Sequence, residues 1–191
     1  GIKIGWAEVD ITPTEKIALC GEFFERVTNE VETPITVTAL AIESGGEQAV
    51  FCSCDIEGVN ESLVRRARLK LNAPGLDPRN VIINAVHTHN SYTTANPDID
   101  KKNVHNGVLY FKSMMPEDCE YIPADISPDQ MDPLKALDFV SERVAEAVSL
   151  AWNDRKEGLY ANGFGRAAVG MCRRVCYADE TAKMWGDVDT A

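Results

Sequence analysis

The chain has 191 residues, 45% of them hydrophobic and 26% charged, which is ordinary for a globular protein with one substantial core. Its formal net charge is −11, so a basic surface for nucleic acid or for an anionic membrane is not expected. No run of apolar residues approaches the length of about 18 that a membrane-spanning helix needs. We expect a cytoplasmic protein with reduced thiols on its six cysteines; secretion after removal of a signal peptide upstream of Gly1 is the alternative.

The first half of the chain predicts a strand-rich unit. The hydrophobic pattern predicts strands over 2–9, 35–43, 48–56 and 80–86, and a helix over 61–72. Gly45-Gly46 marks a hairpin turn between the second and third strands, and Asn60 is the expected N-cap of the helix. The third strand carries Asp55 and Glu57 at its end. Residues 14–34 show no regular period and are predicted to be irregular.

The second half combines one long helix with one long insertion. Asp132-Pro133 is a suitable start for a helix over 134–154, whose apolar stripe consists of Leu134, Leu137, Val140, Val144, Val148 and Ala151. Residues 91–133 lack periodicity and form either a lid or substrate wall, or a solvated insertion without a role. Residues 158–176 are predicted to be extended, with a short strand at Met184-Trp185. The sequence therefore predicts an α/β fold, with a mixed β-sheet packed by helices, as a single incomplete domain over 1–191.

The strand over 80–86 leads directly into His87-Thr88-His89, which holds two of the three histidines of the chain. If the strand continues through them, both side chains point to one side with Cα atoms roughly 6.6 Å apart. Two imidazoles at that spacing can bind one metal ion, or one can bind the metal while the other contacts a substrate. The alternative is a strand end with two partly exposed histidines. A position at the carboxyl end of a sheet strand favours a ligand site.

Five separated motifs occur in a fixed order: Val9-Asp-Ile-Thr-Pro13, Gly21-Glu-Phe23, Ser53-Cys-Asp-Ile-Glu-Gly58, Ile83-Asn-Ala-Val-His-Thr-His-Asn-Ser91, and Gly165 to Val175 followed by Met184-Trp-Gly186. In this arrangement the chain resembles the N-terminal catalytic domain of the neutral/alkaline non-lysosomal ceramidase family. The His-Thr-His motif is the most specific piece. The resemblance covers most of the chain outside the 91–133 insertion, and chains of this kind look like short bacterial relatives.

The resemblance implies a zinc-dependent amidohydrolase that cleaves an amide bond with a metal-activated water, on a small-molecule or lipid amide such as an N-acyl lipid. His87 matches a zinc ligand, and His89 matches a catalytic residue that lies near the substrate rather than on the metal. Arg173 matches a catalytic arginine, which would stabilise the developing oxyanion. Gly21 matches a glycine whose backbone lies close to the substrate. Asp55 matches an acidic residue beside the site; alternatively it is a strand-end carboxylate that caps the helix or binds a loop.

The chain departs from the family pattern in two ways. Cys172 stands where the family has an asparagine, next to the matching arginine. The family's remaining zinc ligands lie downstream of that arginine, so one zinc is expected with its other ligands beyond residue 191, in a larger enzyme. One alternative is a ceramidase-like domain that has lost its metal and serves in binding or assembly, and another is a module whose 91–133 segment docks a partner. The family resemblance does not settle the substrate.

Overall fold

The computed structural model describes residues 1–21, 26–92, 94–95, 97, 116–118, 129–170 and 172–186. The chain divides into two compact units, Gly1–Leu159 and Tyr160–Ala191, and each is described by itself. Most of the predicted 91–133 insertion lies outside the described residues. Within the described part of the chain, no helix has the length and apolar character to cross a membrane.

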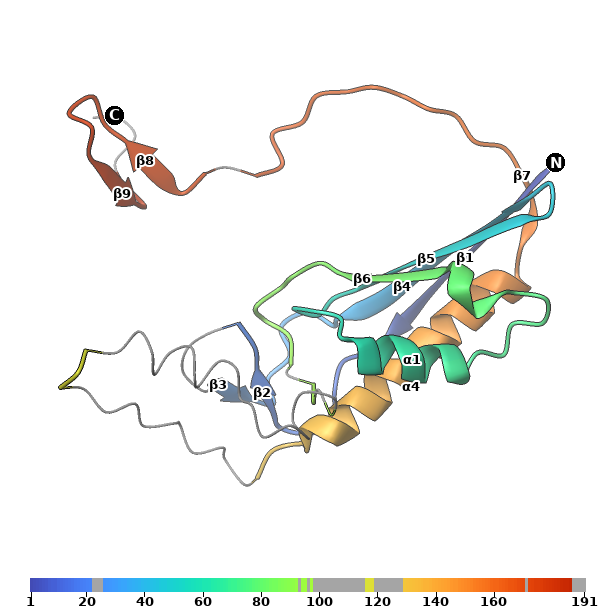
Figure 1. Cartoon of the computed structure of the whole chain (residues 1–191), viewed down its shortest axis with the longest axis horizontal. Coiled ribbons are helices and arrows are strands. Elements are labelled where there is room, and N and C mark those ends of the chain that lie inside the picture. The colour runs from blue at the N-terminus through green and yellow to red at the C-terminus, as the bar shows by residue number, and fades with distance from the viewer. Residues whose placement is uncertain are drawn as a thin grey trace. The chain divides into compact units, whose positions relative to one another are not determined.

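A mixed β-sheet forms the centre of the first unit (Figure 1). Among the described residues its order is β6-β5-β4-β1-β7, with bounds Val81–Ala85, Glu47–Cys54, Thr36–Ser44, Ile2–Asp10 and Lys156–Gly158. The β5 and β6 strands are parallel, whereas the other neighbours are antiparallel. The predicted mixed sheet is therefore confirmed, and β7 is a strand that the sequence did not predict.

The turn between β4 and β5 is the predicted diglycine hairpin. Ser44 pairs with Glu47, which leaves Gly45 and Gly46 as the two turn residues. Their φ angles are 59° and 90°, in the left-handed region that glycine enters without steric cost. The turn thus fixes the register of the long hairpin.

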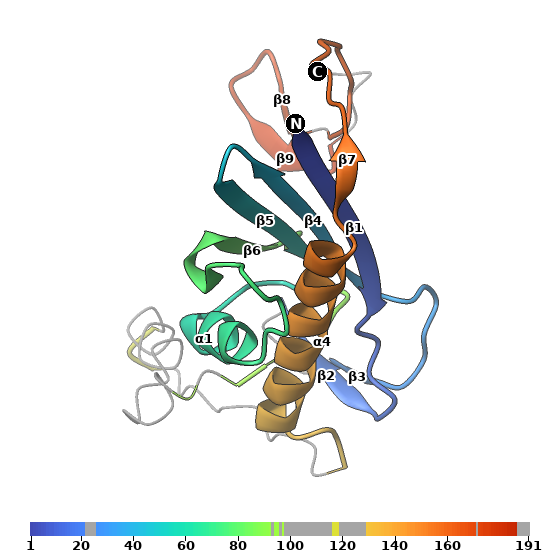
Figure 2. The ribbon, with the colours of Figure 1, turned by 90° about the vertical axis from the view of Figure 1, so that its right-hand side faces the viewer.

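Helices α1 (Glu61–Leu69) and α4 (Pro133–Asn153) pack on the same face of the sheet (Figure 2). Both predicted N-caps are confirmed: the Asn60 side chain accepts a hydrogen bond from the Leu63 amide at 2.9 Å, and Asp132 caps α4. The predicted end of α1 at residue 72 is wrong, because the Lys70 amide bonds Ala67 in a tighter turn that closes the helix earlier.

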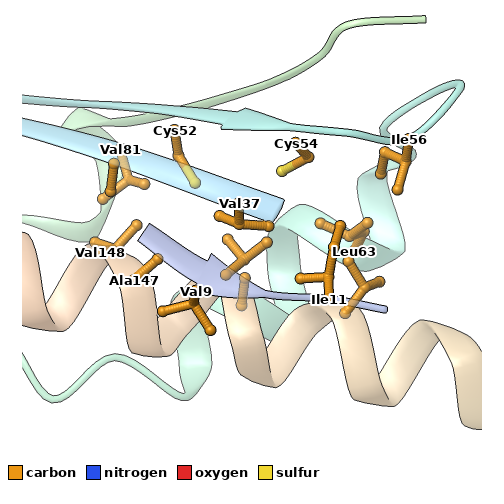
Figure 3. Packing of buried hydrophobic residues seen from close by; sticks show 14 of the residues in the cluster. Val9, Ile11, Val37, Cys52, Cys54, Ile56, Leu63, Val81, Ala147 and Val148 are labelled. Carbon is orange, nitrogen blue, oxygen red and sulfur yellow. The ribbon is translucent and has the colours of Figure 1, made fainter. Parts of the chain in front are cut away.

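The core lies between this face of the sheet and the two helices (Figure 3). Cys52 and Cys54 are fully buried in it as free thiols and pack as small apolar residues. The predicted stripe of α4 is buried except for Leu134, which is 43% exposed. A Cβ at Gly5 would overlap the Ala151 carbonyl, so α4 packs directly on the β1 backbone. This close packing holds the sheet and α4 together.

The prediction that residues 14–34 are irregular is wrong in part. Strands β2 (Ile17–Leu19) and β3 (Arg26–Thr28) pair antiparallel there. Strands of three residues are too short to show the alternation from which a strand is predicted. The second unit holds another short pair, β8 (Arg174–Cys176) with β9 (Ala182–Met184). Within the predicted extended range 158–176, strand is found at the two ends, at Gly158 in β7 and in β8.

Candidate metal centre

The His-Thr-His segment follows β6 but does not continue it. The Val86 amide bonds the Cys54 carbonyl and the His87 amide bonds the Ile56 carbonyl, at 3.0 and 3.1 Å, so the chain still runs beside the end of β5. His87 has a φ of 64°, in the left-handed region, and the predicted extended conformation of the pair is wrong. The two imidazole rings nevertheless meet edge to face, with centroids 5.1 Å apart.

Glu57 completes a cluster with the two histidines. One ligand atom from each of Glu57, His87 and His89 can be chosen so that all three lie within 4.8 Å of one another. Two imidazoles with one carboxylate form a donor set that zinc uses in catalytic sites, where the fourth position is left for water. The side chains of His87 and Glu57 are 70% and 41% exposed, so such a site faces solvent.

The protonation of His87 suits a metal ligand. Its Nδ1 lies 2.8 Å from the Glu57 backbone carbonyl, and a carbonyl oxygen can only accept a hydrogen bond. Nδ1 therefore carries the hydrogen, and in the neutral ring Nε2 keeps its lone pair for a metal. Metal-binding histidines are commonly held by such a bond through the other ring nitrogen. By donor type, the carboxylate and the two imidazoles fit a zinc ion.

The sequence did not assign a role to Glu57, although a signal existed. In the parallel β5–β6 pair, Cys54 lies opposite Ala85. Glu57 and His87 follow those two residues at the same edge of the sheet, where the carboxyl ends of parallel strands meet. Only the knowledge that β5 and β6 are neighbours makes this proximity predictable.

Gly21 approaches His89 through its backbone. It has a φ of 89°, and a Cβ built on it would lie 2.8 Å from the His89 Cβ and still nearer to the ring. No side chain larger than hydrogen fits there without a shift. The resemblance placed Gly21 close to the substrate; the structure places it against His89, and its contact with substrate stays a prediction.

The segment before Gly21 is tied to the segment after His89. The Cys20 amide donates to the Ser91 carbonyl at 3.0 Å, and Leu19 forms a bridge with Tyr92. The Cys20 thiol also donates to the Ser91 carbonyl, at 3.2 Å. Burial raises the pKa of Cys20 and the negative charge of Glu57 raises it further, so the thiol keeps its proton.

Asp55, just after β5, is hydrogen-bonded to Thr36 at the start of β4. Its Oδ2 accepts hydrogen bonds from the Thr36 amide at 2.9 Å and from the Thr36 hydroxyl at 3.3 Å. Asp55 also lines a cleft of about 780 Å³, together with Val86, Thr88 and Asn90. Within the described part of the chain, His87 and His89 do not line this cleft. Alternate residues of the 86–90 segment therefore form the cleft and the metal cluster. The role of Asp55 in substrate binding stays a prediction.

Arg173 belongs to the second unit. Its carbonyl accepts a hydrogen bond from the Trp185 amide at 2.7 Å, and this bond helps to close the β8–β9 hairpin. The neighbouring Cys172 is an exposed free thiol. The role of Arg173 as a catalytic, oxyanion-stabilising residue stays a prediction.

A solved ceramidase has a similar fold. A ceramidase complexed with C2 matches with a TM-score of 0.52 and 16% sequence identity, over 81% of this chain and 22% of that one. The chain has a ceramidase-like fold. The neutral ceramidase from Pseudomonas aeruginosa matches 46% of this chain and 15% of its own, at 25% identity and a TM-score of 0.41. The chain thus spans less than a quarter of either ceramidase that it matches. No family model and no curated protein matches it.

Proposed function

We propose that this chain carries the metal centre of a zinc-dependent amide hydrolase that acts on an N-acyl compound. The observation that carries the proposal is the meeting of Glu57, His87 and His89 on a ceramidase-like fold. A carboxylate and two imidazoles are ligands that zinc favours, and an exposed cluster leaves space for water and substrate.

His87 and Glu57 hold the metal in this proposal, with His89 as the third ligand. A zinc ion bound there would polarise the scissile carbonyl and lower the pKa of its bound water from about 15.7 towards about 7. Glu57 also orients His87 through its backbone carbonyl. The resemblance alone implies that Arg173 would stabilise the oxyanion that forms on the amide carbonyl. The proposed reaction class is hydrolysis of a C–N amide bond, with a small-molecule or lipid amide as substrate.

His89 has two competing assignments. The family resemblance gives it a place beside the substrate, whereas the compact cluster favours its binding to the metal. As a ligand, His89 is needed for zinc binding; as a substrate contact, it is needed only for turnover.

Zinc content measured by elemental analysis tests the proposal. Wild-type protein, His87→Ala and His89→Ala are purified without chelator, with His105→Ala as a control for loss of a histidine. We expect about one zinc per chain in the wild type and in the control, and loss of zinc in both cluster variants. Zinc retained by His89→Ala with lowered turnover would move His89 to the substrate. A zinc-free wild type would overturn the three-ligand site and favour a metal-free binding domain.

Activity is then measured on N-acyl lipids and on small N-acyl amides. We expect hydrolysis that a chelator abolishes and added zinc restores. If the protein binds zinc but cleaves neither class of amide, the metal site is supported and the hydrolase assignment is wrong.

A further inference from the structure

We infer that Arg26 is a positioning residue of the metal centre, which sets the place of His89 by holding its backbone. The inference rests on the proposed metal site, and it adds a residue that contacts neither the metal nor the described ligand atoms. Arg26 lies at the start of β3, far along the chain from the histidines.

The guanidinium of Arg26 joins two separate segments. Its Nη2 donates to the carbonyl of Cys20 at 2.9 Å and to the carbonyl of His89 at 2.5 Å. Its Nη1 lies 3.4 Å from the side-chain oxygen of Asn90 and donates to it. One planar group therefore connects the Cys20-Gly21 backbone with the end of the His-Thr-His motif.

The contacts constrain His89 from two directions. Arg26 holds its carbonyl, while the Gly21 backbone lies against its ring. A guanidinium presents several N–H donors in a rigid fork, so it can hold both carbonyls at once, whereas an ammonium is a single point of charge. Arg26 Nε is buried without a partner among the described residues, so burial of this guanidinium carries a desolvation cost.

The positive charge of Arg26 and its positioning role act on zinc affinity in opposite directions. A cation near a metal site opposes metal binding, because like charges repel. Removal of the Arg26 charge would by electrostatics alone strengthen zinc binding. If Arg26 instead places His89 for the metal, its removal weakens zinc binding. The direction of the change in zinc affinity therefore separates the two effects.

Arg68 provides a matched control. It is half-buried like Arg26, its Nη2 donates to the Val81 carbonyl at 3.0 Å at the start of β6, and its Nε also lacks a partner within the described part of the chain. Arg68 thus contacts the start of β6, and Arg26 contacts the loop that follows β6. Arg26→Gln and Arg68→Gln therefore remove similar guanidinium groups from the two ends of the 81–89 segment. Both variants should lose thermal stability, but only Arg26→Gln should alter the metal site.

The zinc dissociation constant of the wild type and of both variants is measured by competition with a chromophoric chelator, well below each melting temperature. We expect a 10- to 100-fold weaker affinity in Arg26→Gln, the range typical of lost supporting contacts, and no change in Arg68→Gln. Arg26→Lys should give an intermediate value. Cobalt substituted for zinc should show an altered visible spectrum only in Arg26→Gln. Equal or tighter zinc binding in Arg26→Gln would overturn the inference while leaving the metal site intact.

A metal-free measurement keeps the inference testable if the wild type binds no zinc. Nitrogen-15 NMR of the imidazole rings reports the environment of His89 in the apo protein. We expect the His89 signals to shift in Arg26→Gln and to stay in place in Arg68→Gln. Unshifted His89 signals in both would show that Arg26 does not position this residue, whatever the outcome for the metal.

Discussion

Gly21 lies so close to His89 that a methyl group on the glycine would overlap the imidazole. The added Cβ would be 2.5 Å from the ring Nδ1 and 2.8 Å from the His89 Cβ. A backbone with no side chain thus forms one wall of the candidate metal centre. The wall belongs to the segment that leads from β2 towards β3, which was predicted to be irregular.

A side chain at Gly21 should displace His89 and weaken zinc binding. We expect Gly21→Ala to weaken zinc binding at least 10-fold, because His89 must move to make room for the methyl group. Gly75→Ala is the matched control, since Gly75 also has a positive φ, 81°, but has open space around it. Both changes should cost about 1–2 kcal/mol of stability through backbone strain. Titration with zinc and denaturant unfolding measure the two effects; equal zinc affinity in both variants would contradict the steric role.

Glu57→Gln tests the carboxylate without disturbing the backbone. The variant keeps the size of the side chain and the carbonyl that holds His87, but it removes a charged ligand. We expect a loss of zinc affinity of about 100-fold or more, beyond what an outer contact supplies. Glu61→Gln, at the exposed start of α1, should bind zinc like the wild type. Calorimetric titration measures both, and an unchanged affinity in Glu57→Gln would remove this residue from the site.

Asp55→Asn separates the tie to Thr36 from substrate binding. A neutral acceptor makes weaker hydrogen bonds than a carboxylate, so we expect unfolding free energy to fall by about 1 kcal/mol. Zinc content should be unchanged. Thr36→Val, which removes only the hydroxyl contact, should cost less. Denaturant unfolding and the KM for an N-acyl amide are compared; full stability with a raised KM would favour the substrate-binding role that the resemblance implies.

Tyr92 should make the protein sensitive to alkali. Its hydroxyl is buried with no partner in the described part of the chain, and burial raises its pKa above the ordinary value of 10.0, with the negative charge of Asp10 acting in the same direction. A raised pKa means that the stability it contributes is complete below pH 10 and is lost as pH rises above it, by about 1.4 kcal/mol per pH unit.

The Tyr92→Phe variant removes this dependence. Near pH 8 we expect its stability to lie within about 1 kcal/mol of the wild type, because an unpartnered buried hydroxyl contributes little. Above pH 10 the variant should lose stability less steeply than the wild type. Urea unfolding across this range provides the comparison. Parallel curves would show that Tyr92 does not govern the alkaline transition.

Much of the fold could be predicted because its signals are local. The alternation of β4 and β5, the diglycine turn and the caps at Asn60 and Asp132 each depend on a few neighbouring residues. The short strands could not be predicted in this way. The β7 strand has three residues and pairs with β1, from the other end of the first unit, and nothing in its own sequence indicates that partner.

The sequence by itself determined that two imidazoles follow a sheet strand at its carboxyl end. The tertiary structure alone decided which groups surround them. Glu57 joins the histidines because β5 and β6 are parallel neighbours, and Gly21 and Arg26 reach His89 because Leu19 and Cys20 pair with the chain beyond it. These contacts link residues that are tens of positions apart. Such pairings result from the closure of long loops around a common core, and no local pattern of residue types encodes them.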